Sequence, residues 1–560
     1  MAEQSQVIEG TRRFWHRPKS TLVIASYALK QFLELYGFSQ FATSSDRKSG
    51  KQIIHNDNGI IKAHNAISIK RWVLLWLEGL ADTEWKEGGV FHGHDKFEVL
   101  ETWQNFSATQ LTTKVLNDLT IFSEEGFNDT EQLNLFSDEA NTCHIRFQNG
   151  VVRITADDIK LLSYDEVQTE GAVFETGIIN RNITLSDESR RGKGLFSTFA
   201  QRAMYRRKAQ KPELTSDWTD EFEINDAAKQ HYKGLRTAYG YLIHSHNTSD
   251  TRKAVYFIDA ESDMKEAQGG NGKSVIAKSL EHYKAIAVQD GKRFRSAAGS
   301  GAQFQFSNVN LDTKICLIDD IRPDFSFDML FSMITGDMEV ERKGVDKFVI
   351  PASRTPKFIL TTNYVIAGSG VSYTRRQHIV EFGAYWNRCN IEKEKPSAAK
   401  HLGKMLFDDF NDDDWNDFYN YGFKCVQEYF NDGLVQASIS NYERKALAAT
   451  IEGEEGDGEI TDWIDNWIRN TRVEGGFHQG DGIAAEDLYG AFASDMGAKA
   501  VEWDFKRFDK AVWDFVKGMK GYEYNAHLAA KGTSKSNRRW QRGEAGKQRN
   551  HIRITTDTDI

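Results

Sequence analysis

A strand, a glycine-rich loop and a helix that begins at Gly-Lys-Ser constrain this 560-residue chain more than any other feature. The segment VYFIDA (255–260) is apolar and β-prone, and GGNGKSVIAKSL (269–280) passes from a glycine-rich loop into a helical pattern. Such a loop presents backbone N–H groups to phosphate oxygens at the amino end of a helix. We therefore predict a phosphate-binding loop of the Walker A type, made of Gly269, Gly270, Asn271, Gly272, Lys273, Ser274 and Val275.

The chemistry of this loop requires these residue types. We expect Lys273 to place its charge on the β- and γ-phosphates of ATP, and Ser274 to offer its hydroxyl to Mg²⁺. The GxxxxGK[ST] pattern has a glycine where this chain has Ala267, and we expect Gly269 and Gly270 to supply the flexibility instead. A chance Gly-Lys-Ser in a surface loop is the alternative that the motif alone leaves open.

A second apolar strand, KICLIDDI (314–321), ends in two carboxylates. This is the pattern of a Walker B strand, in which Asp319 holds Mg²⁺ and Asp320 polarises the attacking water. A core strand that ends in a solvated turn is the alternative for this segment taken alone.

Two further signals follow along the chain. KFILTTNY (357–364) is another apolar strand, and Asn363 at its end can orient the water at the γ-phosphate. YTRRQHIVEF (373–382) places Arg375 and Arg376 before a strand, where an arginine can neutralise charge on the transferred phosphoryl group of a neighbouring subunit. The order of these signals predicts an ATPase built on a parallel α/β sheet.

The ordered segments GGNGKS, LIDDI, EVERKGVDKFVI, ILTTNY and RRQHIVEF resemble those of superfamily-three helicases. More narrowly, they are similar to the primase–helicase proteins of phages, plasmids and large DNA viruses. ITGD (334–337), followed by Arg342, Lys343 and Lys347, resembles the hairpin that reaches single-stranded nucleic acid in the channel of such rings. The resemblance is strong over 235–385 and weaker over 20–235.

This resemblance implies an AAA+-like P-loop ATPase core in a ring that is usually hexameric. The ring would use ATP and Mg²⁺ to translocate on single-stranded DNA and to unwind fork DNA, beside other replication proteins. Carried over by position, the metal ligands are Ser274 and Asp319, and the catalytic residues are Lys273, Asp319, Asp320, Asn363 and either Arg375 or Arg376.

The charge and the cysteine content of the chain indicate where in the cell this activity is expected and how the chain could contact nucleic acid. Lys and Arg number 71 against 81 Asp and Glu, so any contact with nucleic acid must come from local basic patches. The four cysteines form no CxxC pair, and neither a secretory signal nor an apolar run of about 18 residues is present. We expect a multidomain protein of the cytoplasm, or of the host cytoplasm if the source is viral, with no membrane partner.

The predicted fold is α/β, with an AAA+-like core between two flanking regions. Six segments are predicted: 1–186, an accessory α+β region; 187–253, a basic helical connector; 254–390, the ATPase core; 391–451, an acidic helical segment; 452–459, a linker; and 460–560, a winged-helix-like nucleic-acid-binding domain with a basic tail.

Local patterns support these segments. Helices are predicted over 21–37 and 67–80, and a hairpin is predicted at the Asn-Asp-Asn-Gly between them. Further short strands are predicted around Asn149-Gly150. The basic stretch 187–211 is expected to pack on the acidic segment 408–417 or to be solvated, and the acidic helix itself is expected to be a solvated face.

The last hundred residues have the composition of a nucleic-acid-binding domain. Helices are predicted over 485–496 and 505–519, separated by a turn at Gly497, and 505–519 is the candidate recognition helix. A basic hairpin with one internal tryptophan follows, and its candidate contacts are Arg538, Arg539, Trp540 and Arg542. A solvated tail on a helical cap is the alternative.

Other functions remain open at this point. His92-Gly93-His94 and the Tyr205–Lys208 segment suggest a rolling-circle initiator, although glycine stands between the histidines. No spaced Asp-x-Asp pattern stands out as the site of a bifunctional primase–helicase. An RNA-virus-type ATPase and a non-enzymatic, ATP-assembled origin-binding protein are the remaining alternatives.

Overall fold

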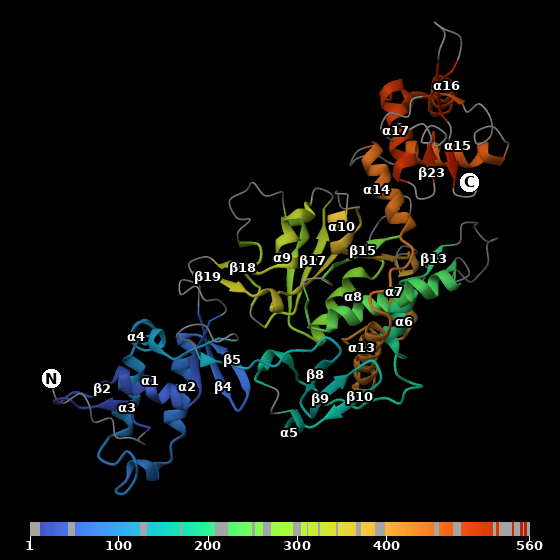
Figure 1. Cartoon of the computed structure of the whole chain (residues 1–560). Coiled ribbons are helices and arrows are strands. Elements are labelled where there is room, and N and C mark those ends of the chain that lie inside the picture. The colour runs from blue at the N-terminus through green and yellow to red at the C-terminus, as the bar shows by residue number, and fades with distance from the viewer. Residues whose placement is uncertain are drawn as a thin grey trace.

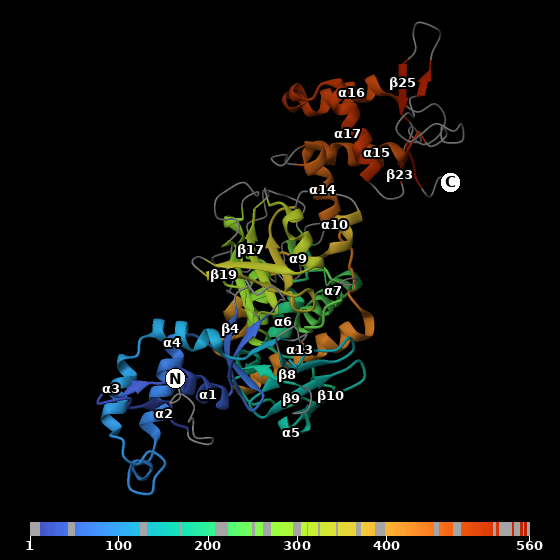
Figure 2. The same cartoon turned by 60° about the vertical axis from the view of Figure 1, so that its left-hand side comes forward.

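The computed structural model contains three regions arranged along one long axis (Figure 1). The first region lies at one end, a central parallel sheet lies in the middle, and the last helices lie at the other end, as the turned view confirms (Figure 2). The structure describes residues 12–42, 51–123, 131–167, 171–207, 222–223, 225–248, 252–260, 270–294, 304–310, 312–322, 325–342, 345–365, 371–386, 398–452, 458–473, 483–518, 522–525, 540–542, 549–552 and 554–556.

The central sheet has five strands, and every neighbouring pair in it is parallel. Its order is β16-β17-β20-β15-β21, so the first strand of the sheet in sequence lies between the last two. The strands are β15 (Ala254–Asp259), β16 (Ile286–Asp290), β17 (Ile315–Ile321), β20 (Lys357–Thr362) and β21 (Gln377–Phe382). The prediction of a parallel α/β arrangement over this stretch is confirmed.

Alternate residues of these strands enter two different hydrophobic cores. Val255 and Leu317 point to one face, where α6 (Leu195–Arg202), α7 (Asp226–Ile243), α8 (Lys273–Ser279) and α13 (Asp412–Asp432) cover the sheet. Tyr256 and Ile318 point to the other face, which η9 (Phe327–Leu330), α9 (Phe331–Thr335) and the hairpin β18 (Met338–Arg342) with β19 (Val345–Ile350) cover. Burial on both faces explains the continuous apolar runs within these strands, such as 255–258 in β15 and 315–318 in β17.

The first region contains a six-stranded sheet and a helical cluster with its own aromatic core. The sheet consists of β3 (Phe38–Ala42), β4 (Gln52–Asp57), β5 (Ile60–His64), β6 (Ile121–Ser123), β7 (Glu131–Gln132) and β11 (Val173–Phe174). Around it lie β1 (Trp15–His16), β2 (Val23–Ile24), α1 (Ser26–Leu35), α2 (Ala66–Gly79), α3 (Lys96–Asn105) and α4 (Ala108–Lys114).

Both predicted hairpins are present. β4 and β5 pair across Asn58 and Gly59, whose positive φ angles of 51° and 86° suit a tight two-residue turn. A second sheet pairs β8 (Cys143–Phe147), β9 (Gly150–Ile154), β10 (Ile159–Leu162) and β12 (Ile178–Ile179), and α5 (Tyr164–Val167) follows β10. Between the helices of the connector lies the pair β13 (Arg206–Arg207) and β14 (Phe222–Glu223).

The last region packs four helices around a fourth hydrophobic cluster. Its helices are α14 (Ser440–Glu452), α15 (Glu459–Val473), α16 (Ala485–Met496) and α17 (Phe505–Gly518). Its strands are β22 (Ile483–Ala484), β23 (Tyr522–Tyr524), β24 (Trp540–Arg542), β25 (Arg549–Ile552) and β26 (Ile554–Thr556). The two predicted helices are found, and β24 pairs with β25 as the predicted hairpin.

Two expectations are corrected by the packing. A helix was predicted over 21–37, but α1 is shorter at both ends. Residues 23–24 pair with β1 instead, and Gly37, with a φ of 83°, ends the helix. The acidic helix is solvated only at its charged residues, such as the exposed Asp412 and Asp413, because α13 also buries aromatic residues such as Trp415 and Phe418 in the core of the central sheet. The basic stretch does contact it, through Arg190 on Asp417 at 3.2 Å.

The hydrophobic packing does not break at the predicted segment boundaries. One cluster joins β8, α6 and α7 to the sheet and to α13, so it crosses the boundaries at 186/187, 253/254 and 390/391. The short α12 (Ala398–Leu402) contributes Leu402 to its margin. Within the described residues, no helix is both long and apolar enough to cross a bilayer.

Buried histidines predict a loss of stability in acid. Burial lowers the pKa of His231 and of His378 to about 4, and that of His244 to about 3. The pKa of a histidine in the unfolded chain is near 6.5, so each of these buried, neutral side chains stabilises the fold fully above pH 6.5. This contribution is lost as the pH falls from 6.5 through about 4. We expect the free energy of unfolding to fall by about 3 kcal/mol for each of these histidines over this pH interval. Urea unfolding at pH 7 and pH 4.5 measures this loss, and His378→Phe should make it smaller; equal stability at both pH values would contradict it.

Candidate active site

The predicted phosphate-binding and metal-binding residues meet at one edge of the central sheet. Because β17, β20 and β15 are parallel neighbours, their carboxyl ends lie side by side. The Lys273 Nζ donates to Asn363 Oδ1 at 2.7 Å, which joins the loop after β15 to the end of β20. The Ser274 hydroxyl donates to Asp319 Oδ1 at 2.8 Å, which joins the same loop to β17.

Asp259, the last residue of β15, also belongs to this site, although it is part of none of the predicted motifs. Its Oδ1 accepts a short hydrogen bond from Lys273 and a second one of 2.7 Å from Asn271 Nδ2. All three side chains are buried, with exposed fractions of 7% or less. The signal in the sequence was the carboxylate at the carboxyl end of the strand that precedes the glycine-rich loop.

Burial and charge oppose each other at Lys273. Burial lowers the pKa of Lys273 below its ordinary value, while the carboxylate of Asp259 raises it. A buried ammonium is stable only when it is paired. Asp259 therefore holds the lysine in place at the point where a phosphate would otherwise provide the negative charge.

Asp319 lies among three donors. Besides Ser274, the Thr361 hydroxyl donates to its Oδ1 at 2.6 Å, and the Lys278 ammonium lies 2.7 Å from its Oδ2. Burial alone would raise the pKa of Asp319, but these hydrogen bonds outweigh it and hold the pKa below its usual range. The carboxylate is therefore ionised at neutral pH, as a metal ligand must be.

Asp320 is held in a strained conformation beside it. Its φ is 60°, and the register between β17 and β20 shifts between Ile318 and Ile321, which is a β-bulge. The Asp320 N–H donates to Thr361 Oγ1 at 2.8 Å. The bulge turns Asp320 away from Asp319, so that its side chain instead pairs with Lys292 at 2.6 Å.

The glycine-rich loop is described from Gly270 onward, so Gly269 and Ala267 lie outside the described residues. Gly270 and Gly272 have φ angles of 77° and 93°, which only glycine adopts without strain. A side chain at Gly272 would also meet the Phe199 ring at 2.9 Å. Val275 is 41% exposed, one turn into α8.

The residues present fit a nucleotide and Mg²⁺. Asp259 Oδ2 and Asn271 Oδ1 are buried polar atoms with no hydrogen-bond partner in the described part of the chain. Ser274 and Asp319 offer the hard oxygen ligands that Mg²⁺ prefers. Two protein ligands are enough, because phosphate oxygens and water molecules complete the coordination shell of Mg²⁺. The described residues contain no cluster of three or more acidic, His or Cys side chains.

Arg375 and Arg376 do not join this group. They end α10 (Val371–Arg376), directly before β21, and Gln377 pairs in register with Ala254 at the amino end of β15. The candidate site lies at the opposite end of β15, roughly 17 Å along the strand. The Arg376 guanidinium lies 4.7 Å over the ring of Phe331.

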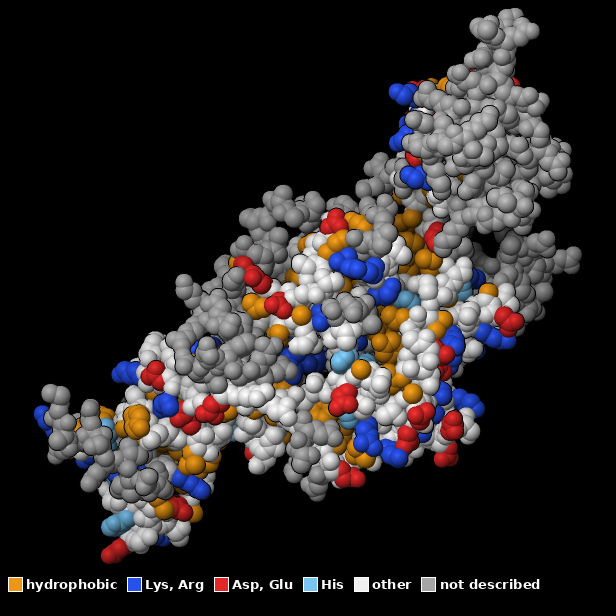
Figure 3. Space-filling view, in the orientation of Figure 1, with side chains coloured by type: hydrophobic (Ala, Val, Ile, Leu, Met, Phe, Trp, Pro, Cys, Tyr) orange, Lys and Arg blue, Asp and Glu red, His pale blue; other side chains and the backbone are white. Residues whose placement is uncertain are grey.

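The candidate nucleic-acid contacts are only partly described. Arg342 ends β18, and its guanidinium donates to the backbone oxygens of Ser307 (3.0 Å) and Val309 (2.8 Å). Lys343, Arg538 and Arg539 lie outside the described residues; Lys347, Trp540 and Arg542 are described only as positions on β19 and β24. On the face drawn in Figure 3, the described acidic and basic side chains are intermixed over the central region.

The fragments that suggested a rolling-circle initiator lie in different cores. His94 Nε2 accepts a hydrogen bond of 3.1 Å from the Arg13 guanidinium, and its ring packs against Trp15 in the first region. Tyr205 packs against Tyr385 beside the central sheet. Lys208 lies outside the described residues.

The contact between Lys273 and Asp259 predicts a large effect on stability. Asp259→Asn leaves the buried ammonium without its counter-charge, so we expect a loss of roughly 3–5 kcal/mol in the free energy of unfolding. The double variant Asp259→Asn/Lys273→Met should lose less than the sum of the two single variants. Urea unfolding of all four proteins measures the coupling, and strictly additive losses would contradict it.

Comparisons with known proteins add little to this geometry. Residues 266–376 match the model of a family described as one of unknown function, DUF5906. No curated protein matches the sequence. A solved structure of the C-terminal region of NrS-1, in an apo form, has a TM-score of 0.37 at 9% identity, covering 94% of this chain and 99% of that one. A second structure of that region has a TM-score of 0.33 at 12% identity, covering 94% and 98%. These scores are too low to support an argument about function.

Proposed function

We propose that this protein is an ATP-dependent DNA helicase that forms a ring and moves along single-stranded DNA. The observation that carries the proposal is the meeting of Lys273 with Asn363, and of Ser274 with Asp319, at the carboxyl edge of the parallel sheet. The order of these residues in the chain matches superfamily-three helicases. A chance Gly-Lys-Ser would not require a hydroxyl from α8, a carboxylate from β17 and an amide from the end of β20 at the same point.

Each residue has a role in this proposal. Lys273, released from Asp259, binds the β- and γ-phosphates, and backbone N–H groups of the loop bind their oxygens. Ser274 and Asp319 would hold Mg²⁺, which neutralises charge on the phosphates. Asn363 orients the attacking water, and Asp320 accepts its proton after leaving Lys292.

Nucleic acid is assigned to two elements that carry basic residues, of which the first, 338–350, is neutral overall because Glu339, Glu341 and Asp346 balance Arg342, Lys343 and Lys347. The β18–β19 hairpin projects from the sheet in Figure 1, and Lys343 lies between its strands. The β24–β25 pair carries Arg542 and Arg549, and Arg538 and Arg539 directly precede β24 in the sequence. Single-stranded nucleic acid binds to positively charged and aromatic side chains, which both strand pairs contain in their sequences.

Helicase activity is tested directly with a forked DNA duplex. We expect unwinding that requires ATP and Mg²⁺, together with multiple-turnover ATPase that single-stranded DNA stimulates. A matched RNA fork distinguishes the RNA-virus-type alternative. ATP binding without turnover would reject the helicase and favour an assembly switch.

The basic hairpin predicts a change in the salt dependence of binding. Truncation before Ala529 would also remove Ile552 and Ile554, which are buried in the core of this region, so substitution is the better test. Arg538→Gln/Arg539→Gln/Arg542→Gln removes up to three phosphate contacts. We expect the slope of log affinity against log salt for single-stranded DNA to become flatter by about 2.

The control for this experiment removes three other positive charges. Lys160, Lys229 and Lys233 lie on the surface of other regions, in exposed or half-buried ion pairs. Their replacement by glutamine should leave the slope unchanged. Equal slopes for wild type and the hairpin variant would show that the tail is only solvated.

A further inference from the structure

An apolar cavity of about 340 Å³ lies against α8, the helix that begins at Lys273. Three elements supply its apolar lining: α8 contributes Val275, α6 contributes Phe199, and α12 with the turn after it contributes Leu402 and Met405. The cavity therefore shares a helix with the candidate active site.

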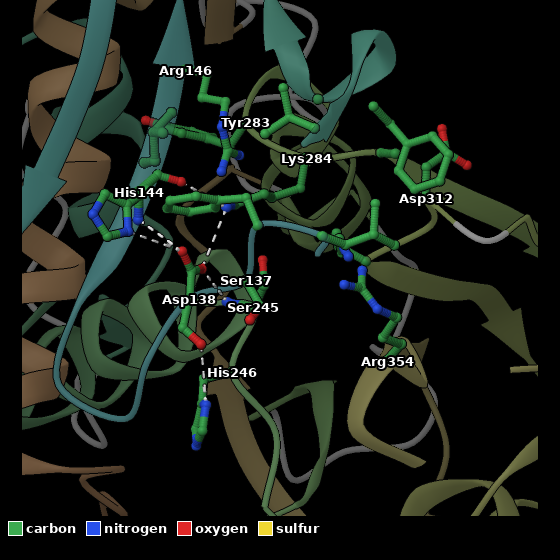
Figure 4. Close-up of a pocket in the computed structure, with 18 of the residues that line it drawn as sticks. Ser137, Asp138, His144, Arg146, Ser245, His246, Tyr283, Lys284, Asp312 and Arg354 are labelled. Atoms are coloured by element: carbon green, nitrogen blue, oxygen red, sulfur yellow. Dashed lines mark hydrogen bonds and ion pairs between the residues drawn. The ribbon is translucent and has the colours of Figure 1, made fainter. Parts of the chain in front are cut away.

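The cavity begins where the glycine-rich loop enters α8. A side chain at Gly272 would meet the ring of Phe199 at 2.9 Å, and the same ring lines the cavity. Val275 follows Lys273 by two residues, which is about 3 Å along the helix axis. Figure 4 shows a different, polar cavity, whose Lys284 lies just before β16, at the opposite edge of the sheet. Only the apolar cavity is within reach of a group attached to phosphates at Lys273.

The walls of this cavity offer apolar and aromatic surface. Val275 and Met405 are 41% and 50% exposed, so their apolar surfaces are open to a ligand. Phe407 has a φ of 70°, which residues other than glycine rarely adopt, and its ring lies 4.8 Å from the ring of His282. Backbone strain of this kind persists only where the surrounding structure enforces it, and it is concentrated at ligand sites.

Three polar side chains of the lining are engaged elsewhere. The Ser279 hydroxyl donates to a backbone oxygen of α8 at 2.7 Å, Lys278 pairs with Asp319 at 2.7 Å, and Lys404 pairs with Asp414. None of the described side chains that line the cavity has a buried polar atom without a hydrogen-bond partner. A site that selects a ligand by hydrogen bonds needs such atoms, because they are unpaired until the ligand binds.

We propose that this cavity holds the base and ribose of the bound nucleotide and accepts adenine and guanine alike. The inference rests on the proposed function, because it requires the phosphates to bind at Lys273. Aromatic and apolar surface packs against the face of either purine, whereas a choice between them requires hydrogen bonds to the edge of the base. The volume lies within the range of small-molecule sites. The substrates of the chain would then be purine nucleoside triphosphates rather than ATP alone.

Calorimetric titration of the full chain with ADP, GDP and pyrophosphate, each with Mg²⁺, tests the proposal. These ligands carry the same two phosphates and differ in the group that would occupy the cavity. We expect ADP to bind at least about tenfold more tightly than pyrophosphate, because its nucleoside buries apolar surface. We expect the affinity for GDP to lie within about threefold of that for ADP.

Two variants locate the nucleoside in the cavity. Ala399→Trp narrows the cavity from α12 without changing the glycine-rich loop, and it should lower the affinity for ADP to near that for pyrophosphate. Val275→Ala/Met405→Ala removes exposed apolar surface and should weaken ADP about tenfold. Both variants should bind pyrophosphate like wild type. The control is Leu75→Ala, which removes a 56% exposed side chain from α2 in the first region and should leave all affinities unchanged.

The outcomes separate this inference from the proposed function. Binding of neither ADP nor pyrophosphate to the folded chain would reject the phosphate-binding loop, and with it both proposals. Equal affinities for ADP and pyrophosphate, or undiminished ADP binding in both cavity variants, would overturn the cavity and leave the loop in place. A preference for ADP over GDP of more than about 100-fold would overturn the common acceptance of both purines.

Discussion

Replacing Lys273 by alanine is expected to reduce ATP hydrolysis by about 10² to 10³-fold, because the change removes the charge that binds the β- and γ-phosphates. The loss should appear in turnover with and without single-stranded DNA. A coupled assay for released phosphate measures it. Undiminished ATP hydrolysis by folded Lys273→Ala protein would show that this glycine-rich loop does not bind the phosphates of ATP.

The structure adds a requirement to this experiment. Lys273 neutralises the buried Asp259, so Lys273→Ala should also be less stable than wild type. Lys357 gives a matched control, since it is a buried lysine of the same sheet whose ammonium bonds to the backbone oxygens of Tyr241 and His244. Lys357→Ala should lose stability and keep hydrolysis, which separates unfolding from catalysis.

The second large effect concerns Arg375 and Arg376. Both are distant from the site in their own subunit, so they can act on phosphate only across a subunit interface. Arg375→Ala/Arg376→Ala should therefore bind ATP but hydrolyse it roughly 10³-fold more slowly. Mixed with Lys273→Ala subunits, it should regain activity, because about a quarter of the interfaces then pair an intact loop with intact arginines.

This complementation is a specific test of the ring. Two inactive proteins regain hydrolysis only if each supplies what its neighbour lacks. Sedimentation with ATP and single-stranded DNA provides the assembly state of the same samples. A mixture that stays inactive although the subunits assemble would assign the arginines a structural role, which the stacking of Arg376 on Phe331 already allows.

Local chemistry explains which elements could be predicted. The hairpin at Asn58-Gly59 and the helix over 485–496 depend on turn residues and on periodicity within a few residues of the chain. The helix over 21–37 was too long, because pairing of residues 23–24 with a distant strand overrode the local pattern. The prediction that the acidic helix is a solvated face holds for only part of α13, because its acidic residues lie on one face and its buried aromatic residues lie on another.

The sequence by itself determined the chemical parts of the candidate site: the glycine-rich loop, the lysine and serine that follow it, and the polar residues that end two apolar strands. Only the tertiary structure decided how they combine. The position of β15 between β20 and β21 brings Asp259, Lys273, Asp319 and Asn363 together and carries Arg375 and Arg376 to the far edge. Strand order depends on packing between segments more than a hundred residues apart, which no local pattern records.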